Sequence, residues 1–351
     1  MIKVFQRGRI AMIDVSGAYN HICTNEEFSD ALGFNFPGTD YWFKYTSMAF
    51  GARVGPVWYC VHGSMLPNLA RHLRPDLFDG SRGAIGVWVD DLFYFASTAE
   101  IAAEGFEFLK DLFDPLGFRR SERKTFDPQK FRLVLGIVMD LDQGRILLGD
   151  EKVKRYLTHI EGILSREVNF DKKAAEKLVG RMCWLSSFDD WAPAYLYSLY
   201  FCVYCQYNER QLILSGDHPL SVRFHAEIYF WKSLIKNRVL WTVDNEPKII
   251  RVIYTDSSQD FFGSYDCREN FVYECISDDM MGEPIVIKEL HAVETHIKRC
   301  GLPSNTNVLV LVVTDSQNVQ SVLNKHYAKA ESIRSKWDSG LRPFLEKHGI
   351  R

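Results

Sequence analysis

Two aspartates separate two apolar runs in the stretch IGVWVDDLFYF (residues 85–95). Apolar runs of this length around a short polar break are typical of a β-hairpin, so we expect Asp90 and Asp91 at its turn. Residues 9–15 also have the pattern of a strand, and this strand reaches Asp14. Because an acidic pair is a common turn dipeptide, the hairpin by itself does not indicate a site.

Strand and helix patterns continue on both sides of this hairpin. Helical spacing predicts helices over residues 55–73 and 98–116, the second capped by Ser97 or Thr98 and ending at Gly117. A second hairpin is expected over residues 131–148, with its turn at 142–144.

The rest of the chain changes character twice. Residues 151–240 are mostly helical in pattern, with helices over 152–164, 172–184 and 219–237 and a buried aromatic helix over 192–207. A boundary is expected near residues 244–247. Strands then return over 249–254, 261–265, 271–277 and 307–314, with helices over 288–300 and from 316. The prediction is an α+β chain with three parts: residues 1–150, 151–245 and 249–351.

Composition limits the class of protein without naming it. The 351 residues are 46% hydrophobic and 25% charged, as in ordinary globular proteins, and the net charge is −3. The chain therefore lacks the global basic bias of many nucleic-acid binders, although a local groove can still be basic. No stretch predicts a membrane span, and scattered cysteines without a signal peptide predict a reduced intracellular protein, cytoplasmic or nuclear.

Five short motifs in order resemble those of reverse transcriptases. They are DVSGAY (residues 14–19, motif A), FGARVGP (50–56, motif B), VDD (89–91, motif C), Gly117 and Lys124 with Pro128 and Gln129 (motif D), and Leu135-Gly136 (motif E). The resemblance covers roughly residues 8–150. Within it, the chain is most similar to retrotransposon reverse transcriptases of the long-terminal-repeat or DIRS-like kind. It implies a reverse-transcriptase palm followed by a helical thumb or connection.

The resemblance also implies the chemistry of the acids. Asp14 and Asp90 would hold two Mg²⁺ or Mn²⁺ ions, and Asp91 would be a supporting carboxylate. The partners would be an RNA template, a DNA primer and deoxynucleoside triphosphates, and the rest of a retroelement polyprotein.

Four further residues would then meet the nucleotide. Tyr19 would be a steric gate against the ribose 2′-hydroxyl, and Lys124 would protonate the pyrophosphate. Phe50 and Gly51 would shape the nucleotide pocket. A core aromatic for Tyr19 and a surface lysine for Lys124 are the structural alternatives.

A second set of acids follows a strand, lies in a helix and follows another strand. The segments TDSS (255–258), KELHA (288–292) and TDSQN (314–318) resemble the ribonuclease H domain that follows the polymerase in such elements. Asp256, Glu289 and Asp315 would be catalytic ligands of two metal ions that cut the RNA strand of an RNA–DNA hybrid. Asp315-Ser316 is also a plain helix N-cap by position.

Parts of both resemblances are missing from the chain. No fingers segment precedes motif A, and no fourth acid follows at the expected distance, since Asp338 falls too early. We therefore expect a truncated α/β ribonuclease H-like domain lacking its last segment, and little polymerase activity from the isolated chain. The alternative is a catalytically impaired remnant that keeps the fold and at most binds nucleic acid.

Three weaker signals remain open. Cys202 and Cys205 form a lone Cys-x-x-Cys pair, which without a second pair predicts buried thiols rather than a zinc site. The basic run Arg119, Arg120, Arg123 and Lys124 could contact phosphates or could be a solvated face. Aromatic residues crowd the region 184–204, which favours a connection core over a base-stacking platform.

Overall fold

The structure is a computed structural model that divides into two compact units, residues 1–147 and 148–351. It describes residues 2, 4–189, 191–243, 249–266, 270–299, 308–326, 328, 330–348 and 350, with only the backbone at 249 and 250.

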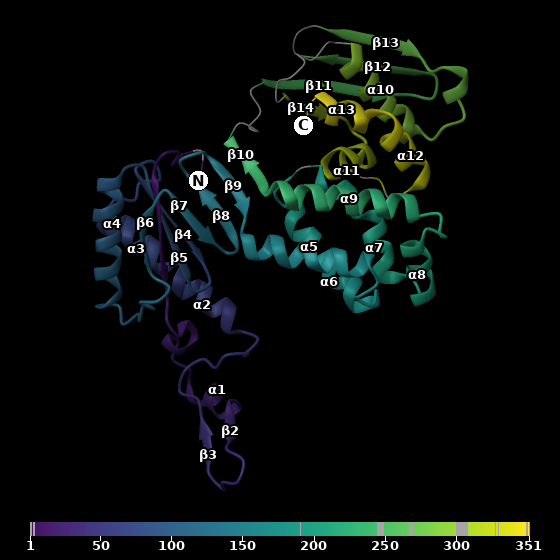
Figure 1. Ribbon diagram of the computed structural model, residues 1–351. Coiled ribbons are helices and arrows are strands. Elements are labelled where there is room, and N and C mark those ends of the chain that lie inside the picture. The colour runs from purple at the N-terminus through teal and green to yellow at the C-terminus, as the bar shows by residue number, and fades with distance from the viewer. Residues whose placement is uncertain are drawn as a thin grey trace. The chain divides into compact units, whose positions relative to one another are not determined.

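A four-stranded antiparallel sheet organises the first unit (Figure 1). Its order is β4 (Gly83–Trp88), β5 (Asp91–Ala96), β1 (Arg9–Asp14) and β6 (Phe126–Gln129). The hairpin predicted around the two aspartates is present, but Asp91 begins β5 instead of lying in the turn. The turn is made by Val89, at φ 52°, and Asp90. A left-handed valine is unusual, because β-branched residues rarely take positive φ.

Helix α4 (Ala99–Phe113) packs on this sheet and closes its core. The hydroxyl of Thr98 accepts a hydrogen bond from the Ile101 amide, which is the predicted N-cap. The helix ends four residues before Gly117, because Pro115 cannot continue the hydrogen-bond ladder. A Cβ at Gly105 would lie 2.2 Å from the Tyr94 hydroxyl, so this glycine permits the close approach of helix and sheet.

The predicted helix over residues 55–73 is two helices, α2 (Gly55–Gly63) and α3 (Met65–Leu73). The break at Ser64 follows from Pro67, which has no amide hydrogen to donate to the carbonyl four residues earlier. The segment between motifs A and B holds η1 (Ala18–His21), α1 (Glu26–Ala31), β2 (Gly33–Asn35) and β3 (Trp42–Lys44). The β2–β3 hairpin projects from the sheet of this unit (Figure 1).

The hairpin predicted over residues 131–148 has one turn more than expected. The structure has β7 (Phe131–Val134), β8 (Ile137–Asp140) and β9 (Arg145–Leu148). Leu135 and Gly136, both at positive φ, form the extra turn between β7 and β8. Two consecutive positive-φ residues are the geometry of a tight I′-type hairpin turn.

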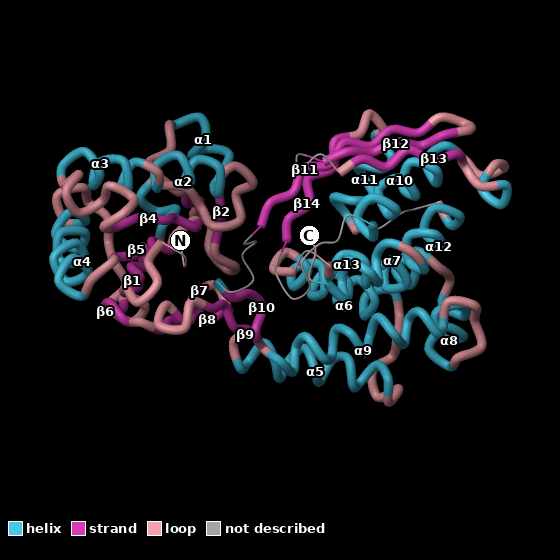
Figure 2. Tube along the Cα trace, turned by 90° about the horizontal axis from the view of Figure 1, so that it is seen from above, coloured by secondary structure: helices cyan, strands magenta, loops and turns pink. Residues whose placement is uncertain are grey.

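The second unit begins with a layer of helices (Figure 2). They are α5 (Asp150–Leu164), α6 (Lys172–Ser186), η2 (Ala192–Leu196), α7 (Tyr197–Tyr204), α8 (Tyr207–Ser215) and α9 (Ser221–Asn237), and the short strand β10 (Val239–Thr242) follows. The single aromatic helix predicted over residues 192–207 is wrong. That segment is η2 and α7, and its end is exposed, with Tyr204 81% accessible.

A sheet of mixed parallel and antiparallel strands completes this unit. Its order is β13 (Phe271–Cys275), β12 (Phe261–Asp266), β11 (Ile249–Ser257) and β14 (Val308–Val313). Strands β11 and β14 are parallel, and the others are antiparallel. Helix α10 (Ile285–Arg299) packs on β11 and β12. The turn η4 (Asp278–Met280) precedes it, and α11 (Gln317–Lys325), α12 (Glu331–Ser339) and α13 (Leu341–His348) follow β14.

In this unit, the first strand of the sheet is longer than expected. Asp256 was expected after the end of its strand, but β11 runs on to Ser257, so Asp256 lies within it. The boundary predicted near residues 244–247 lies outside the described residues. In the part of the chain that is described, no helix is both long and apolar enough to cross a membrane.

Candidate active sites

Asp14 lies at the end of the central strand of the first sheet. Its residue is 4% exposed, and its register partner on β5 is Asp91. The amide of Val15 donates to the carbonyl of Asp90, with 2.8 Å between nitrogen and oxygen. The antiparallel pairing of β1 and β5 therefore brings the three aspartates predicted from the sequence together at one end of these two strands.

The closeness of these carboxylates changes their electrostatics. Burial, and then repulsion from Asp90 and Asp14, raise the pKa of Asp91 to about 6. Burial, followed by the same two carboxylates, also raises the pKa of the Tyr59 phenol, which stays protonated beneath them. Tyr59 was not among the predicted residues, and only its helical position in α2 could have suggested it.

Lys124 is the cation of the cluster. Its ammonium nitrogen lies 3.0 Å from Oδ1 of Asp14, and this hydrogen bond raises the pKa of Lys124. The preceding backbone follows β1, since Ser16 donates to the carbonyl of Arg119 and Ser121 donates to that of Asp14. Lys124 of motif D therefore lies against Asp14 of motif A, while its side chain stays exposed at the surface.

Aromatic rings form a row beside these acids. The ring of Tyr19 contacts the edge of Phe50, with centroids 5.1 Å apart, and that of Tyr59 at 5.9 Å. Phe50 is exposed and Tyr59 is buried, so the row runs from the surface to the core. Gly51 has a φ of 90°, which only glycine adopts without strain, and lies at this open end.

The second set of acids meets at one end of the sheet in the other unit. Asp256 on β11 and Asp315, which follows β14, line the same hollow of about 610 Å³. Glu289 on α10 responds to both, since burial and then their repulsion raise its pKa, while a hydrogen bond from Ser316 opposes this. Strands β11 and β14 pair in parallel up to Tyr254 and Val313, so Asp256 near the end of β11 and Asp315 after β14 lie at the same end of the sheet.

Glu289 carries an unpaired buried oxygen. The residue is 9% exposed, and its Oε2 has no hydrogen-bond partner among the described residues. The buried hydroxyl of Ser257, next to Asp256, also has none within the described ranges. A buried carboxylate oxygen without a partner is costly, and a cation is the partner that its charge calls for.

Both clusters fit a magnesium ion by the chemistry of their donors. Carboxylate oxygens are the ligands that Mg²⁺ prefers. In both clusters burial, and to a lesser extent repulsion from neighbouring carboxylates, raises the pKa of one acid. In this conformation, the described residues include no three His, Cys, Asp or Glu side chains arranged as a complete metal site.

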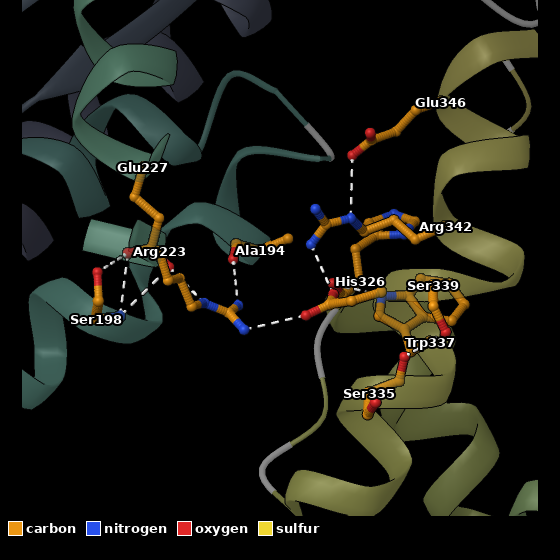
Figure 3. A network of polar contacts seen from close by, with 11 residues as sticks. Ala194, Ser198, Arg223, Glu227, His326, Ser335, Trp337, Ser339, Arg342 and Glu346 are labelled. Atoms are coloured by element: carbon orange, nitrogen blue, oxygen red, sulfur yellow. Dashed lines mark hydrogen bonds and ion pairs between the residues drawn. The ribbon is translucent and has the colours of Figure 1, made fainter. Parts of the chain in front are cut away.

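Asp338 lies apart from the second cluster, as its early position in the sequence suggested. It accepts hydrogen bonds from Arg223, at 3.0 Å, and from Arg342, at 2.8 Å. Figure 3 labels both arginines. Arg223 also binds the buried carboxylate of Glu227. These contacts join α9 to α12 and α13, so Asp338 has a structural role.

Within the described ranges, the lone cysteine pair is not part of a group of His, Cys, Asp or Glu residues that could hold a metal ion. Cys202 is buried, which raises its pKa to about 12, and Cys205 is partly buried. Both are free thiols, and the sulfur of Cys205 bonds the Cys202 carbonyl.

Comparisons with known proteins give similarity in fold. No family model matches the chain, and no curated protein matches it in sequence. Among solved structures, a foamy viral protease-reverse transcriptase in complex with double-stranded DNA matches with a TM-score of 0.52 and 15% identity, over 98% of this chain. Two further structures of the foamy viral enzyme, with an RNA/DNA hybrid and with double-stranded DNA, have TM-scores of 0.49 and 0.47 at 15% and 14% identity. They cover 100% and 98% of this chain, respectively.

The chain spans 56% of the length of the first of these structures, and 45% and 66% of the other two. At this identity the likeness concerns the fold alone. The chain therefore has an α+β fold like that of reverse transcriptases, which confirms the fold class expected from the sequence.

Proposed function

We propose that the chain is the palm, helical and ribonuclease H-like region of a retroelement RNA-directed DNA polymerase. Its substrates would be an RNA template, a DNA primer and deoxynucleoside triphosphates. The observation that carries the proposal is the register of β1 and β5, which sets Asp14 beside Asp91. In the same place the Asp90 carbonyl accepts a hydrogen bond from the Val15 amide. The fold shared with reverse transcriptases supports it.

In this proposal Asp14 and Asp90 hold two Mg²⁺ or Mn²⁺ ions, and Asp91 supports them. When bound, such ions lower the pKa of the attacking primer hydroxyl and neutralise the leaving pyrophosphate. The raised pKa of Asp91 makes this carboxylate a weaker ligand near pH 6 than at higher pH, which suits a supporting role.

Other residues of the first unit act on the nucleotide. Lys124 is protonated and close to Asp14, so it can give a proton to the leaving pyrophosphate. The Tyr19 ring is held between Phe50 and Tyr59, so it can act as a rigid gate against a 2′-hydroxyl. Phe50 and Gly51 would shape the pocket at the open end of this row.

The second unit would cut the RNA strand of an RNA–DNA hybrid. Asp256, Glu289 and Asp315 would hold its two metal ions, and a water molecule would be the nucleophile. The support is the buried Oε2 of Glu289, which has no partner among the described residues, and the pKa of Glu289, which burial and then repulsion from Asp315 and Asp256 raise. The hollow lined by Asp256 and Asp315 gives a substrate access to this place.

The test combines activity with metal binding. The purified chain is given a labelled DNA primer on an RNA template with Mg²⁺, and Mn²⁺ binding is measured by calorimetry. We expect two Mn²⁺ in the first unit of wild type and their loss, with any primer extension, in Asp90→Asn. Asp256→Asn should remove hybrid cleavage and leave extension unchanged.

Asp338→Asn is the matched control, since this acid lies outside both clusters. Wild type that binds neither metal nor substrate would contradict the enzyme proposal. Wild type that binds nucleic acid but neither metal would instead support a catalytically impaired remnant.

A further inference from the structure

A cavity of about 770 Å³ lies in the first unit, and neither proposed active site uses it. Its walls come from the loop after Asp14, from helices α2 and α3 and from the loop after α4. The apolar part consists of five side chains: Met65, Leu66, Leu69, Leu116 and Phe118. An apolar wall with a few polar groups at its rim is the usual form of a small-molecule site.

The polar rim of the cavity is neutral or positive. None of its described lining residues is acidic, and Arg119 is its one permanently charged residue. Among the described residues, none accepts a hydrogen bond from the Arg119 guanidinium, which is exposed. This guanidinium is therefore available to an anion, and arginine is well suited to phosphate.

Two histidines line the same rim with fixed ring orientations. His21 Nδ1 donates to the Ala18 carbonyl at 3.3 Å, so its Nε2 accepts from the Arg119 amide at 3.1 Å. His21 thus positions the backbone of Arg119. His62 Nδ1 donates to the Trp58 carbonyl at 2.9 Å, which leaves Nε2 available for a ligand.

The rim is continuous with the backbone that reaches the catalytic aspartate. The Arg119 carbonyl accepts from Ser16 at 2.7 Å, and the Ser121 amide donates to Asp14 at 2.9 Å. Lys124, in the same segment, pairs with Asp14. A ligand bound by Arg119 would therefore stabilise the segment that carries Lys124.

We propose that this cavity is a second nucleotide site, which takes a nucleoside diphosphate. The base lies on the apolar wall, and the phosphates meet Arg119 and His62. The apolar wall argues against free phosphate or pyrophosphate, which would leave five apolar side chains uncovered. The absence of acidic lining residues argues for an anion over a cation. This site is distinct from the proposed polymerase pocket, because Tyr19, Phe50 and Asp90 do not line it.

The experiment measures binding of ADP to the purified chain by calorimetry, in EDTA, so that metal-bound nucleotide at the carboxylates does not contribute. Adenosine and inorganic pyrophosphate are the probes for the two halves of the ligand. We expect Arg119→Gln to weaken ADP binding about tenfold or more, because it removes a charge-assisted contact. Met65→Glu, which adds an acid at an exposed position of the apolar wall, should also weaken ADP binding.

Arg123→Gln is the matched control, since Arg123 is an exposed arginine of the same segment that does not line the cavity. It should change the affinity less than twofold. Hydrogen exchange at residues 119–125 should slow when ADP binds to wild type.

Three results would overturn the proposal. They are no ADP binding at millimolar concentration, equal losses in Arg119→Gln and Arg123→Gln, and pyrophosphate binding as tight as ADP. Because no metal or primer is present, these results are independent of polymerase activity and leave the proposed function untouched.

Discussion

The two acidic clusters compensate their charge in different ways. In the first, the lysine Lys124 pairs with the most buried acid, Asp14, through a 3.0 Å hydrogen bond. In the second, Glu289 has a serine hydroxyl and one oxygen without a partner, and no cation pairs with it among the described residues. The first cluster is thus partly neutralised by a lysine of the chain, while the second has no such cation beside Glu289 among the described residues.

The difference teaches that similar acids in two sheets need not respond alike to metal. When a metal ion binds, Lys124 must move away from Asp14 or share this carboxylate with the ion. The Oε2 of Glu289 has no hydrogen bond to lose among the described residues. We therefore expect metal to stabilise the second unit more than the first, and the predictions below test this comparison.

The largest effect is expected from Lys124→Met. It leaves the buried Asp14 carboxylate without its cation, at a cost of about 2 kcal/mol in the free energy of unfolding of the first unit. Hydrogen exchange in β1 and β5 measures the change. Arg123→Met, in the same segment, should have little effect, and an equal loss in both variants would show that Lys124 does not compensate Asp14.

The next effect is the response to Mg²⁺. At a concentration about tenfold above its dissociation constant, Mg²⁺ should stabilise the second unit by about 1.4 kcal/mol. Glu289→Gln should remove this gain, because it removes the carboxylate with the unpaired oxygen. Hydrogen exchange in β11 and β14, with and without Mg²⁺, is the measurement. A larger gain in β1 than in β11 would reverse the comparison.

A smaller effect is expected from the pKa of Asp91 in EDTA. This carboxyl has a pKa of about 6 in the folded state and about 4 in the unfolded state. Between these pH values the folded state therefore keeps a proton that the unfolded state has lost. Stability of the first unit should therefore fall as pH rises from about 4 to about 6 and then level off. After allowance for solvent screening, the change is about 1 kcal/mol. Asp91→Asn should flatten this part of the profile, and an unchanged profile would place the titration elsewhere.

The smallest effect is expected from Asp338→Asn. The substitution weakens the contacts of this residue with Arg223 and Arg342. Because the Asp338 side chain is 27% exposed, the free energy of unfolding of the second unit should fall by only about 0.5–1 kcal/mol. The Mg²⁺ response of the unit should stay at the wild-type value. A changed response would connect Asp338 to the second cluster after all.

Regular elements were the part of the fold most readily predicted. The strands over 9–14, 83–88 and 91–96 and the helices over 150–164 and 221–237 lie close to their expected ranges, because each has a clear period of apolar residues. The errors occurred where one residue acts on the backbone. Pro67 and Pro115 broke or shortened helices, and Leu135 and Gly136 added a turn.

The candidate sites divide in the same way. The identities of Asp14, Asp90, Asp256, Glu289 and Asp315 follow from motifs, so the sequence could indicate them, although their catalytic roles stay predictions. Tyr59 beneath the aspartates carried no motif, and the cavity beside Arg119 required four separate segments to meet.

By itself, the sequence determined which residues could carry charge and where strands and helices would form, since local period and motif spacing are properties of the chain. The tertiary structure decided how those charges are compensated. Strand register set Asp14 against Asp91, and the return of the segment after α4 set Lys124 on Asp14. The packing of α10 left one oxygen of Glu289 without a partner. These outcomes depend on contacts between residues tens of positions apart, and burial then amplifies each of them, because a charge removed from water depends on its few remaining neighbours.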